Sequence, residues 1–95
     1  MNNRSPANRQ PLAELHGLGP KSAAMLASVG ITSVGQLKRL GSVRAYAMVK
    51  ATEARASLNL LWALEGALTG LPWQVVAKEH RLSLLLALEA LNDDA

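Results

Sequence analysis

The segment LAELHGLGPKSAAML near the N-terminus holds the residues whose types and spacing best suit the binding of an anion. Gly17 and Gly19 lack a Cβ atom, so the backbone between them can take a positive φ and approach a ligand closely. Pro20 suits the first position of a helix, where its missing N–H costs nothing, and Lys21 and Ser22 would continue that helix. Free amide N–H groups at the helix start, the positive end of the helix dipole and the Lys21 ammonium would together favour a phosphate there.

Two short helices must hold this turn in place. We expect Leu12 and Leu15 to support the first helix, Ala23 and Leu26 to pack the second helix against it, and Leu18 to point inward. This spacing is typical of a helix-hairpin-helix. A glycine-rich turn can also serve only as a tight connection in an all-α core, but the Pro-Lys-Ser that follows favours contact with an anion.

Further basic residues follow in the next two predicted helices. Lys38 and Arg39 end one of them, and with Arg44 they would extend a basic rim beside the hairpin. Their position at the negative end of a helix dipole could by itself explain Lys38 and Arg39. Contacts to phosphates would position the protein on DNA without reading its sequence. The candidate nucleic-acid-binding residues are therefore Gly17, Gly19, Lys21, Ser22, Lys38, Arg39 and Arg44.

The composition predicts an all-α fold. The 95 residues include 18 Leu and 16 Ala but only ten β-branched residues, which favours helix over strand. We expect one domain over residues 11–92, a compact bundle of about five to six short helices that opens with a helix-hairpin-helix-like (SAM-like) unit. Residues 1–10 are polar and are expected to form a flexible arm, from which Arg4 and Arg9 could touch a phosphate backbone.

Caps and breaks delimit the later helices. We predict helices over 20–29, ended by Gly30 with Ile31 packing on the core, over 33–40, over 43–52 with Ser42 as cap, and over 58–68 with Ser57 as cap. The segment TGLPW should break the chain before a last helix over 78–91.

The last two predicted helices carry more apolar residues than one contact needs. The helix over 58–68 is apolar nearly all round, which indicates central burial or a face for a partner. In the last helix, Leu82 and Leu86 mark one face, and Leu84 and Leu88 mark another, so a homo-oligomer through these helices is a second possibility. Glu65 is interpreted as a half-exposed helix residue rather than a functional acid.

Charge is distributed unevenly along the chain. The net charge is +3, with formal charges of about +6 over residues 1–50 and −3 over residues 51–95, which suggests one face turned toward an anionic partner. Only Tyr46, Trp62 and Trp73 are aromatic, so stacking on exposed bases is not the expected binding mode. The absence of cysteine, of a signal peptide and of a membrane-spanning run predicts a soluble, cytoplasmic protein.

Catalysis is not expected. His16 and His80 have no second histidine, cysteine or carboxylate at metal-ligand spacing, and the serines stand mostly where helices need caps. We therefore predict no catalytic residues, no metal and no cofactor.

Four segments resemble a known family: LAELHGLGPKSAAML, GITSVGQLKRLG, VRAYAMVK and SLNLLWALEGALTGLPW are similar to the C-terminal domain of the TfoX (Sxy) proteins. The resemblance covers roughly residues 12–91. It implies a helical domain with a helix-hairpin-helix-like start in a regulator of competence, which promotes transcription together with the catabolite activator protein and RNA polymerase. The segment GLGPKSAAMLASVGITSVGQL also looks like the C-terminal domain of the RNA polymerase α subunit.

TfoX proteins usually carry an additional N-terminal domain, so we expect a standalone relative or an excised domain. Two hypotheses follow from the sequence. The first is a DNA-associated, transcription-regulatory domain that contacts the phosphate backbone. The second is a helical adaptor that binds itself or another protein through its leucine-rich C-terminal helices.

Overall fold

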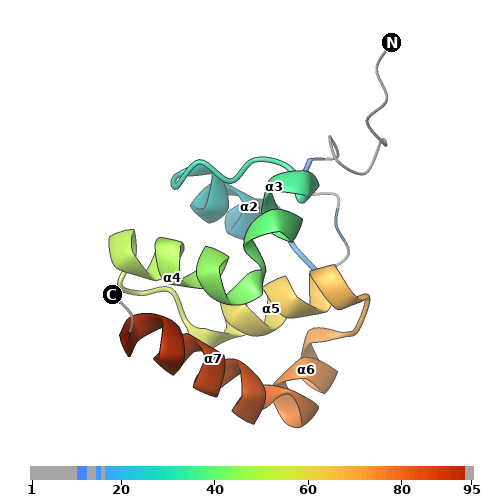
Figure 1. Cartoon of the computed structure of the whole chain (residues 1–95). Helices are drawn as coiled ribbons and strands as arrows, with labels where there is room; N and C mark the ends of the chain where they lie inside the picture. Colours follow the sequence, from blue (N-terminus) through green and yellow to red (C-terminus); the bar gives the residue numbers. More distant parts are fainter. Residues whose placement is uncertain (1–10, 13–14, 16, 94–95) are drawn as a thin grey trace.

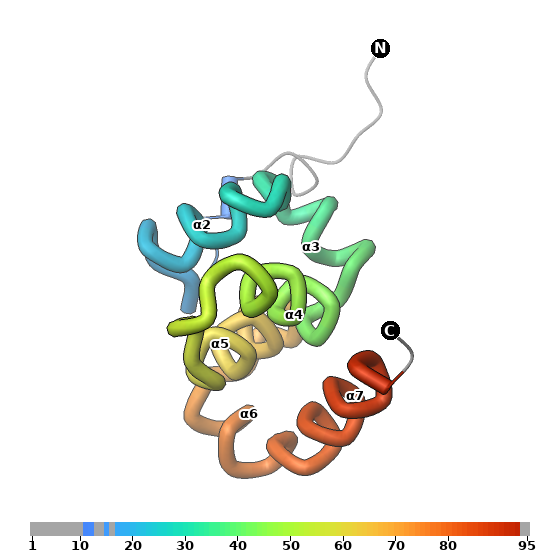
Figure 2. Tube along the Cα trace, turned by 90° about the vertical axis from the view of Figure 1, so that its left-hand side faces the viewer, coloured from blue at the N-terminus to red at the C-terminus, as the bar shows by residue number. Residues whose placement is uncertain are grey.

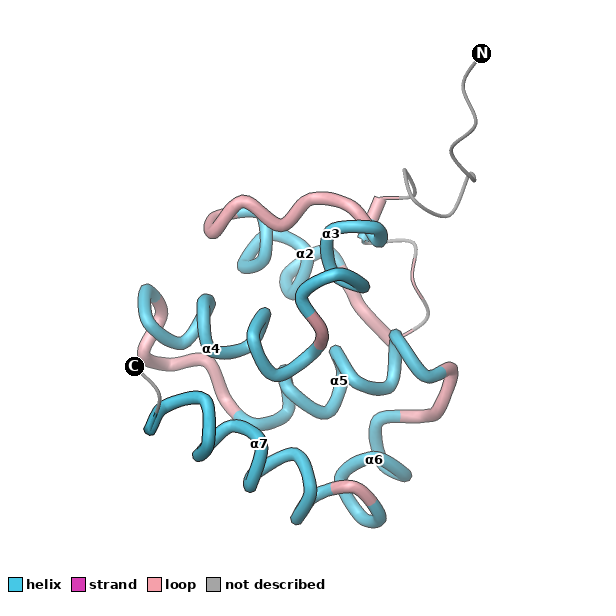
Figure 3. Tube along the Cα trace, in the orientation of Figure 1, coloured by secondary structure: helices cyan, strands magenta, loops and turns pink. Residues whose placement is uncertain are grey.

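A computed structural model describes residues 11–12, 15 and 17–93. The predicted flexible arm, His16 and part of the first predicted helix lie outside the described residues. Within them the chain forms six helices and no strand, as predicted (Figure 3). They are α2 (Pro20–Ala27), α3 (Val34–Leu40), α4 (Ser42–Thr52), α5 (Leu58–Thr69), α6 (Trp73–Glu79) and α7 (Arg81–Asp93).

The ends of α2 and α3 are set by local capping. Gly30 closes the turn after α2 with φ +87°, and the Ile31 N–H donates to the Leu26 carbonyl at 3.0 Å. The predicted glycine closure is confirmed and Ile31 is buried as expected, but α2 ends at Ala27 with Ser28 as its C-cap, two residues before the predicted end at residue 29. Ser33 caps α3: its hydroxyl accepts from the Gln36 N–H, while the Gln36 side chain accepts from the Ser33 N–H.

The start of α4 differs from the prediction. Gly41, with φ +83°, ends α3 and is also the N-cap of α4. Ser42 is therefore the first residue of α4 instead of its cap. Its buried hydroxyl donates to Glu65 Oε1 at 2.7 Å, so a distant carboxylate takes the place of the predicted backbone partner.

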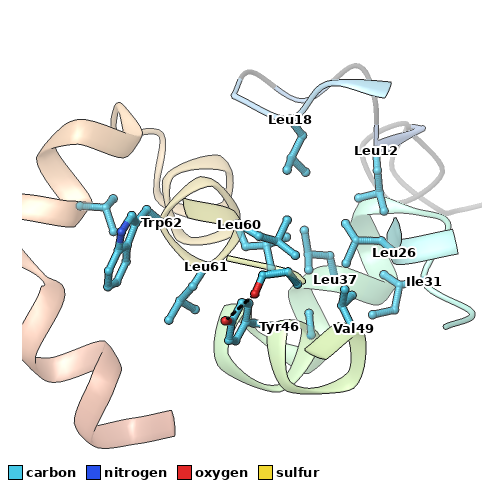
Figure 4. Close-up of a cluster of buried hydrophobic side chains, with 14 of the residues drawn as sticks. Leu12, Leu18, Leu26, Ile31, Leu37, Tyr46, Val49, Leu60, Leu61 and Trp62 are labelled. Carbon is cyan, nitrogen blue, oxygen red and sulfur yellow. Dashed lines mark hydrogen bonds between the residues drawn. The ribbon is translucent and has the colours of Figure 1, made fainter. Parts of the chain in front are cut away.

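Helix α5 lies in the middle of the fold, with α2 and α3 on one side and α6 and α7 on the other (Figures 1 and 2). Of the two interpretations of its apolar surface, the structure supports central burial. Its side chains form the core with residues of α2, α3 and α4 (Figure 4): Leu26, Leu37, Val49, Leu60, Leu61 and Leu64. Ser57 is the N-cap of α5, but its side chain makes no capping hydrogen bond, contrary to the prediction.

The prediction of one last helix over 78–91 is wrong, because two helices occupy residues 73–93. Pro72 is the N-cap of α6, and its carbonyl accepts from the Val75 and Val76 N–H groups at 3.0 and 3.2 Å. The break falls at His80, whose φ of −114° and ψ of 4° leave the helical region. The His80 carbonyl then accepts from the Leu84 N–H at 3.1 Å and starts α7.

Two contacts fix α6 and α7 against α5. At Gly66 a Cβ atom would lie 2.6 Å from the Leu71 carbonyl oxygen, so the α5–α6 connection passes where only glycine fits. The Arg81 guanidinium lies 5.7 Å from the centre of the buried Trp62 ring, which attaches the start of α7 to α5. None of the described helices has the length and apolar character required to cross a bilayer.

Candidate nucleic-acid interface

The turn over residues 17–19, here called the glycine turn, is held at its centre. Leu18 is 4% exposed and packs into the core, which confirms its predicted inward direction. Gly17 and Gly19 are exposed on either side. Gly17 has φ +93°, a conformation that favours glycine.

Gly19 does not need a positive φ, contrary to the expectation for both glycines. Its φ of −99° and ψ of −178° are extended values open to any residue. A Cβ atom added there would meet nothing within 4 Å. Neither the backbone conformation nor the packing of the described residues therefore requires glycine at this position.

At the start of α2, two backbone N–H groups have no partner among the described residues. Among the described residues, the Lys21 and Ser22 N–H groups have no hydrogen-bond partner, whereas the Ala23 N–H already donates to the Gly19 carbonyl at 3.0 Å. No side chain caps this helix, and its first turn holds no acidic residue. Within the described part of the chain, two free amides therefore lie at the helix start that also carries the Lys21 side chain.

A groove of about 640 Å³ opens beside the glycine turn. Gly17, Lys21 and Ser22 line one side of it, and Arg55 and Trp73 lie along the rest. Arg55 and Trp73 are not among the site residues predicted from the sequence. They are distant from the turn in sequence, and only the folding of the chain around α5 brings them to the same groove.

The loop that carries Arg55 is held by the last turns of α4. The Lys50 Nζ atom donates to the carbonyls of Ala54 and Ala56 at 2.6 and 2.8 Å, and the Tyr46 hydroxyl donates to the Ala56 carbonyl at 3.4 Å (Figure 4). Lys50 is thus tied to the fold and does not line the groove. Burial raises the pKa of the Tyr46 phenol above its ordinary value.

The helix that follows this loop, α5, begins beside the same groove. Ser57 and Asn59, at the start of α5, line the groove, and the first turn of α5 contains no acidic residue. Glu53 is the carboxylate among the lining residues, and one of its oxygens accepts from the Arg55 N–H at 3.3 Å. The groove therefore offers two cations, several polar groups and one carboxylate.

The predicted basic rim does not form one surface with the glycine turn. Lys38 and Arg39 are exposed in the last turn of α3. Figure 2 shows the start of α2 on the left and the end of α3 on the right. Arg44 lines a separate cavity of about 390 Å³ together with Glu65. These three cations lie apart from the glycine turn.

The other acidic and histidine side chains form no metal site in the described part of the chain. Glu65 is half-buried, in agreement with its interpretation as a half-exposed helix residue, and it accepts the hydrogen bond from Ser42 across the α4–α5 contact. No group of three or more histidine, cysteine, aspartate or glutamate side chains in the described residues is placed to hold a metal ion.

These features define a small all-helical domain with a cationic groove beside a glycine turn. The chain belongs to the TfoX C-terminal domain family, whose model matches residues 8–88 of its 95 residues. The resemblance seen in the four sequence segments is thereby confirmed. Neither a curated protein nor a solved structure gives a significant match to the chain.

Proposed function

We propose that this chain is a DNA-associated, transcription-regulatory domain that contacts the phosphate backbone through a helix-hairpin-helix at the glycine turn. Gly17, Gly19, Lys21 and Ser22 form the proposed contact. The observation that carries the proposal is the pair of N–H groups at Lys21 and Ser22 that have no partner among the described residues and lie beside an exposed ammonium, at a helix start without a side-chain cap. Lys38, Arg39 and Arg44 would contribute general attraction from other faces.

We propose that the protein acts without catalysis or cofactor, in the cytoplasm, and that its partners beside DNA are RNA polymerase or the catabolite activator protein. A role in competence is part of this proposal, and it rests on family membership.

Titration of a labelled DNA duplex at two salt concentrations tests the backbone contact. Binding should weaken steeply with salt, and Lys21→Glu should weaken it further and lower the slope of log K against log salt by about 1. Lys78→Glu is the matched control, because Lys78 is exposed on α6 and does not line the groove. Equal losses in the two variants would remove the glycine turn from the site.

A helical adaptor is the second candidate function, and the outer face of α7 favours it. Leu82 and Leu86 are 71% and 54% exposed and lie one turn apart, whereas Leu84 is buried. Leu84 and Leu88, which the sequence suggested as a second apolar face for a partner, pack against the core. Sedimentation of the parent and of Leu86→Glu tests this candidate: a monomeric parent argues against self-association, and an oligomer that the substitution dissolves supports it.

A further inference from the structure

One aromatic side chain is exposed in the groove. Of the three aromatic residues in the chain, Tyr46 and Trp62 are buried, whereas Trp73 is 43% exposed at the start of α6. Gly17 and Trp73 both line the groove, and both also line an adjoining cavity of about 220 Å³. Trp73 therefore lies beside the glycine turn, and its side chain is not among those that form the hydrophobic core or pack against it.

Two cations share the groove with this indole. Lys21 and Arg55 are exposed and come from different walls, α2 and the loop before α5. Glu53 lowers the positive charge, but its carboxylate is engaged with the Arg55 N–H. The floor between the walls is apolar, since Met25, Leu60 and Ala63 also line the groove.

An aromatic surface beside cations suits a nucleotide whose base is unpaired. Such a base stacks on an indole, while the adjacent phosphates are attracted to lysine and arginine. The bases of a duplex are stacked within the helix, so a protein that touches only duplex phosphates has no use for an exposed indole. A volume of about 640 Å³ lies within the range of small-molecule sites and has room for a nucleotide unit.

We propose that this groove binds single-stranded DNA, with a base stacked on Trp73 and the flanking phosphates near Lys21 and Arg55. The inference rests on the proposed function, because it uses the same wall of the groove and names the form of DNA that fits it. This inference differs from the expectation that bases do not stack on this protein, which is based on the low number of aromatic residues. Stacking requires an exposed aromatic side chain and does not depend on how many aromatic residues the chain contains.

Fluorescence anisotropy with labelled oligo(dT), oligo(U) and a duplex of equal length tests the inference. The parent should bind oligo(dT) more tightly than the duplex. Trp73→Leu should weaken oligo(dT) binding by roughly 5- to 150-fold and leave duplex binding unchanged, while Trp73→Phe, which keeps an aromatic face, should retain most of the affinity. Arg55→Ala should weaken oligo(dT) binding, and Glu53→Gln should strengthen it.

Thermal unfolding of each Trp73 variant shows whether the fold is intact, and the tryptophan fluorescence of the parent gives an independent signal. Stacking should quench the parent emission on addition of oligo(dT), whereas Trp73→Phe, which retains only the buried Trp62, should not respond.

Three outcomes overturn the inference: tighter binding of the duplex, tighter binding of oligo(U) than of oligo(dT), or an affinity for oligo(dT) that does not depend on residue 73. If both DNA forms bind with a dependence on Lys21 but not on Trp73, the single-strand assignment fails and the backbone contact stands. If neither form binds, both proposals fail.

Discussion

The Nζ atom of Lys50 lies 2.8 Å from the carbonyl oxygen of Ala56, the buried residue of the loop before α5. The same ammonium also donates to the Ala54 carbonyl. The exposed side chain of Lys50 thus closes the loop that carries Arg55. The position of one groove wall consequently depends on the last turn of α4.

Replacing Lys50 by methionine should loosen this loop. Both hydrogen bonds are lost, and because the ammonium is partly solvated we expect the free energy of unfolding to fall by about 1 kcal/mol in urea denaturation. Oligo(dT) binding should weaken too, although Lys50 does not line the groove. Lys38→Met, at the end of α3, is the control for loss of charge. An unchanged urea midpoint would contradict the structural role of Lys50.

The two glycines of the turn should respond differently to alanine. Gly17→Ala places a Cβ atom at φ +93° and should lower the free energy of unfolding by about 1–2 kcal/mol. Gly19→Ala introduces no strain and no contact within 4 Å, so its stability should match that of the parent. Its DNA affinity should nevertheless fall, because the added methyl group stands where a phosphate would approach. A stable Gly19→Ala variant with parental affinity would argue against close approach at this position.

Gly66→Ala should destabilise the fold. Alanine improves helix propensity by as much as about 1 kcal/mol, but its Cβ atom would lie 2.6 Å from the Leu71 carbonyl oxygen. Because that oxygen belongs to the backbone, α5 and α6 must move apart, and we expect a net loss of about 1–3 kcal/mol by thermal or urea unfolding. Gly19→Ala serves as the unstrained control. A variant as stable as the parent would show that the α5–α6 connection adjusts freely.

Stability should decline at alkaline pH through Tyr46. Burial raises the pKa of this phenol above its ordinary value of 10.0, so the unfolded chain loses the phenolic proton before the folded chain does. The contribution is complete below pH 10.0 and is lost as the pH rises through the folded pKa. Urea unfolding on both sides of pH 10.0 should show a steeper decline for the parent than for Tyr46→Phe. Parallel declines would show that the phenol does not contribute.

Local signals explain why α2 to α5 could be predicted from the sequence. Gly30 and Gly41 adopt the positive φ that ends a helix, and Ser33 forms a capping hydrogen bond. The missed helix, α6, has seven residues and a proline at its N-cap, so it offers neither a long apolar period nor a polar capping side chain. The helix break at His80 could not be predicted, because no glycine or proline stands there.

The complete set of groove residues could not be predicted from the sequence, because these residues come together only in the folded chain. Lys21 and Ser22 can be identified because proline and glycine mark the helix start beside them. Arg55 gives no comparable signal, since its placement follows from hydrogen bonds made by Lys50 and Tyr46. Composition does not predict that Trp73 is exposed either, because the other tryptophan of the chain, Trp62, is buried.

Leu18 fixes the glycine turn to the core between the two exposed glycines. A partner that arrives at this turn meets a backbone whose order was established during folding, so little entropy is lost there at the moment of encounter. The association rate should consequently be governed by diffusion and by ionic attraction, without a slow rearrangement step, and differences among variants of the turn should appear mainly in how long the complex lasts.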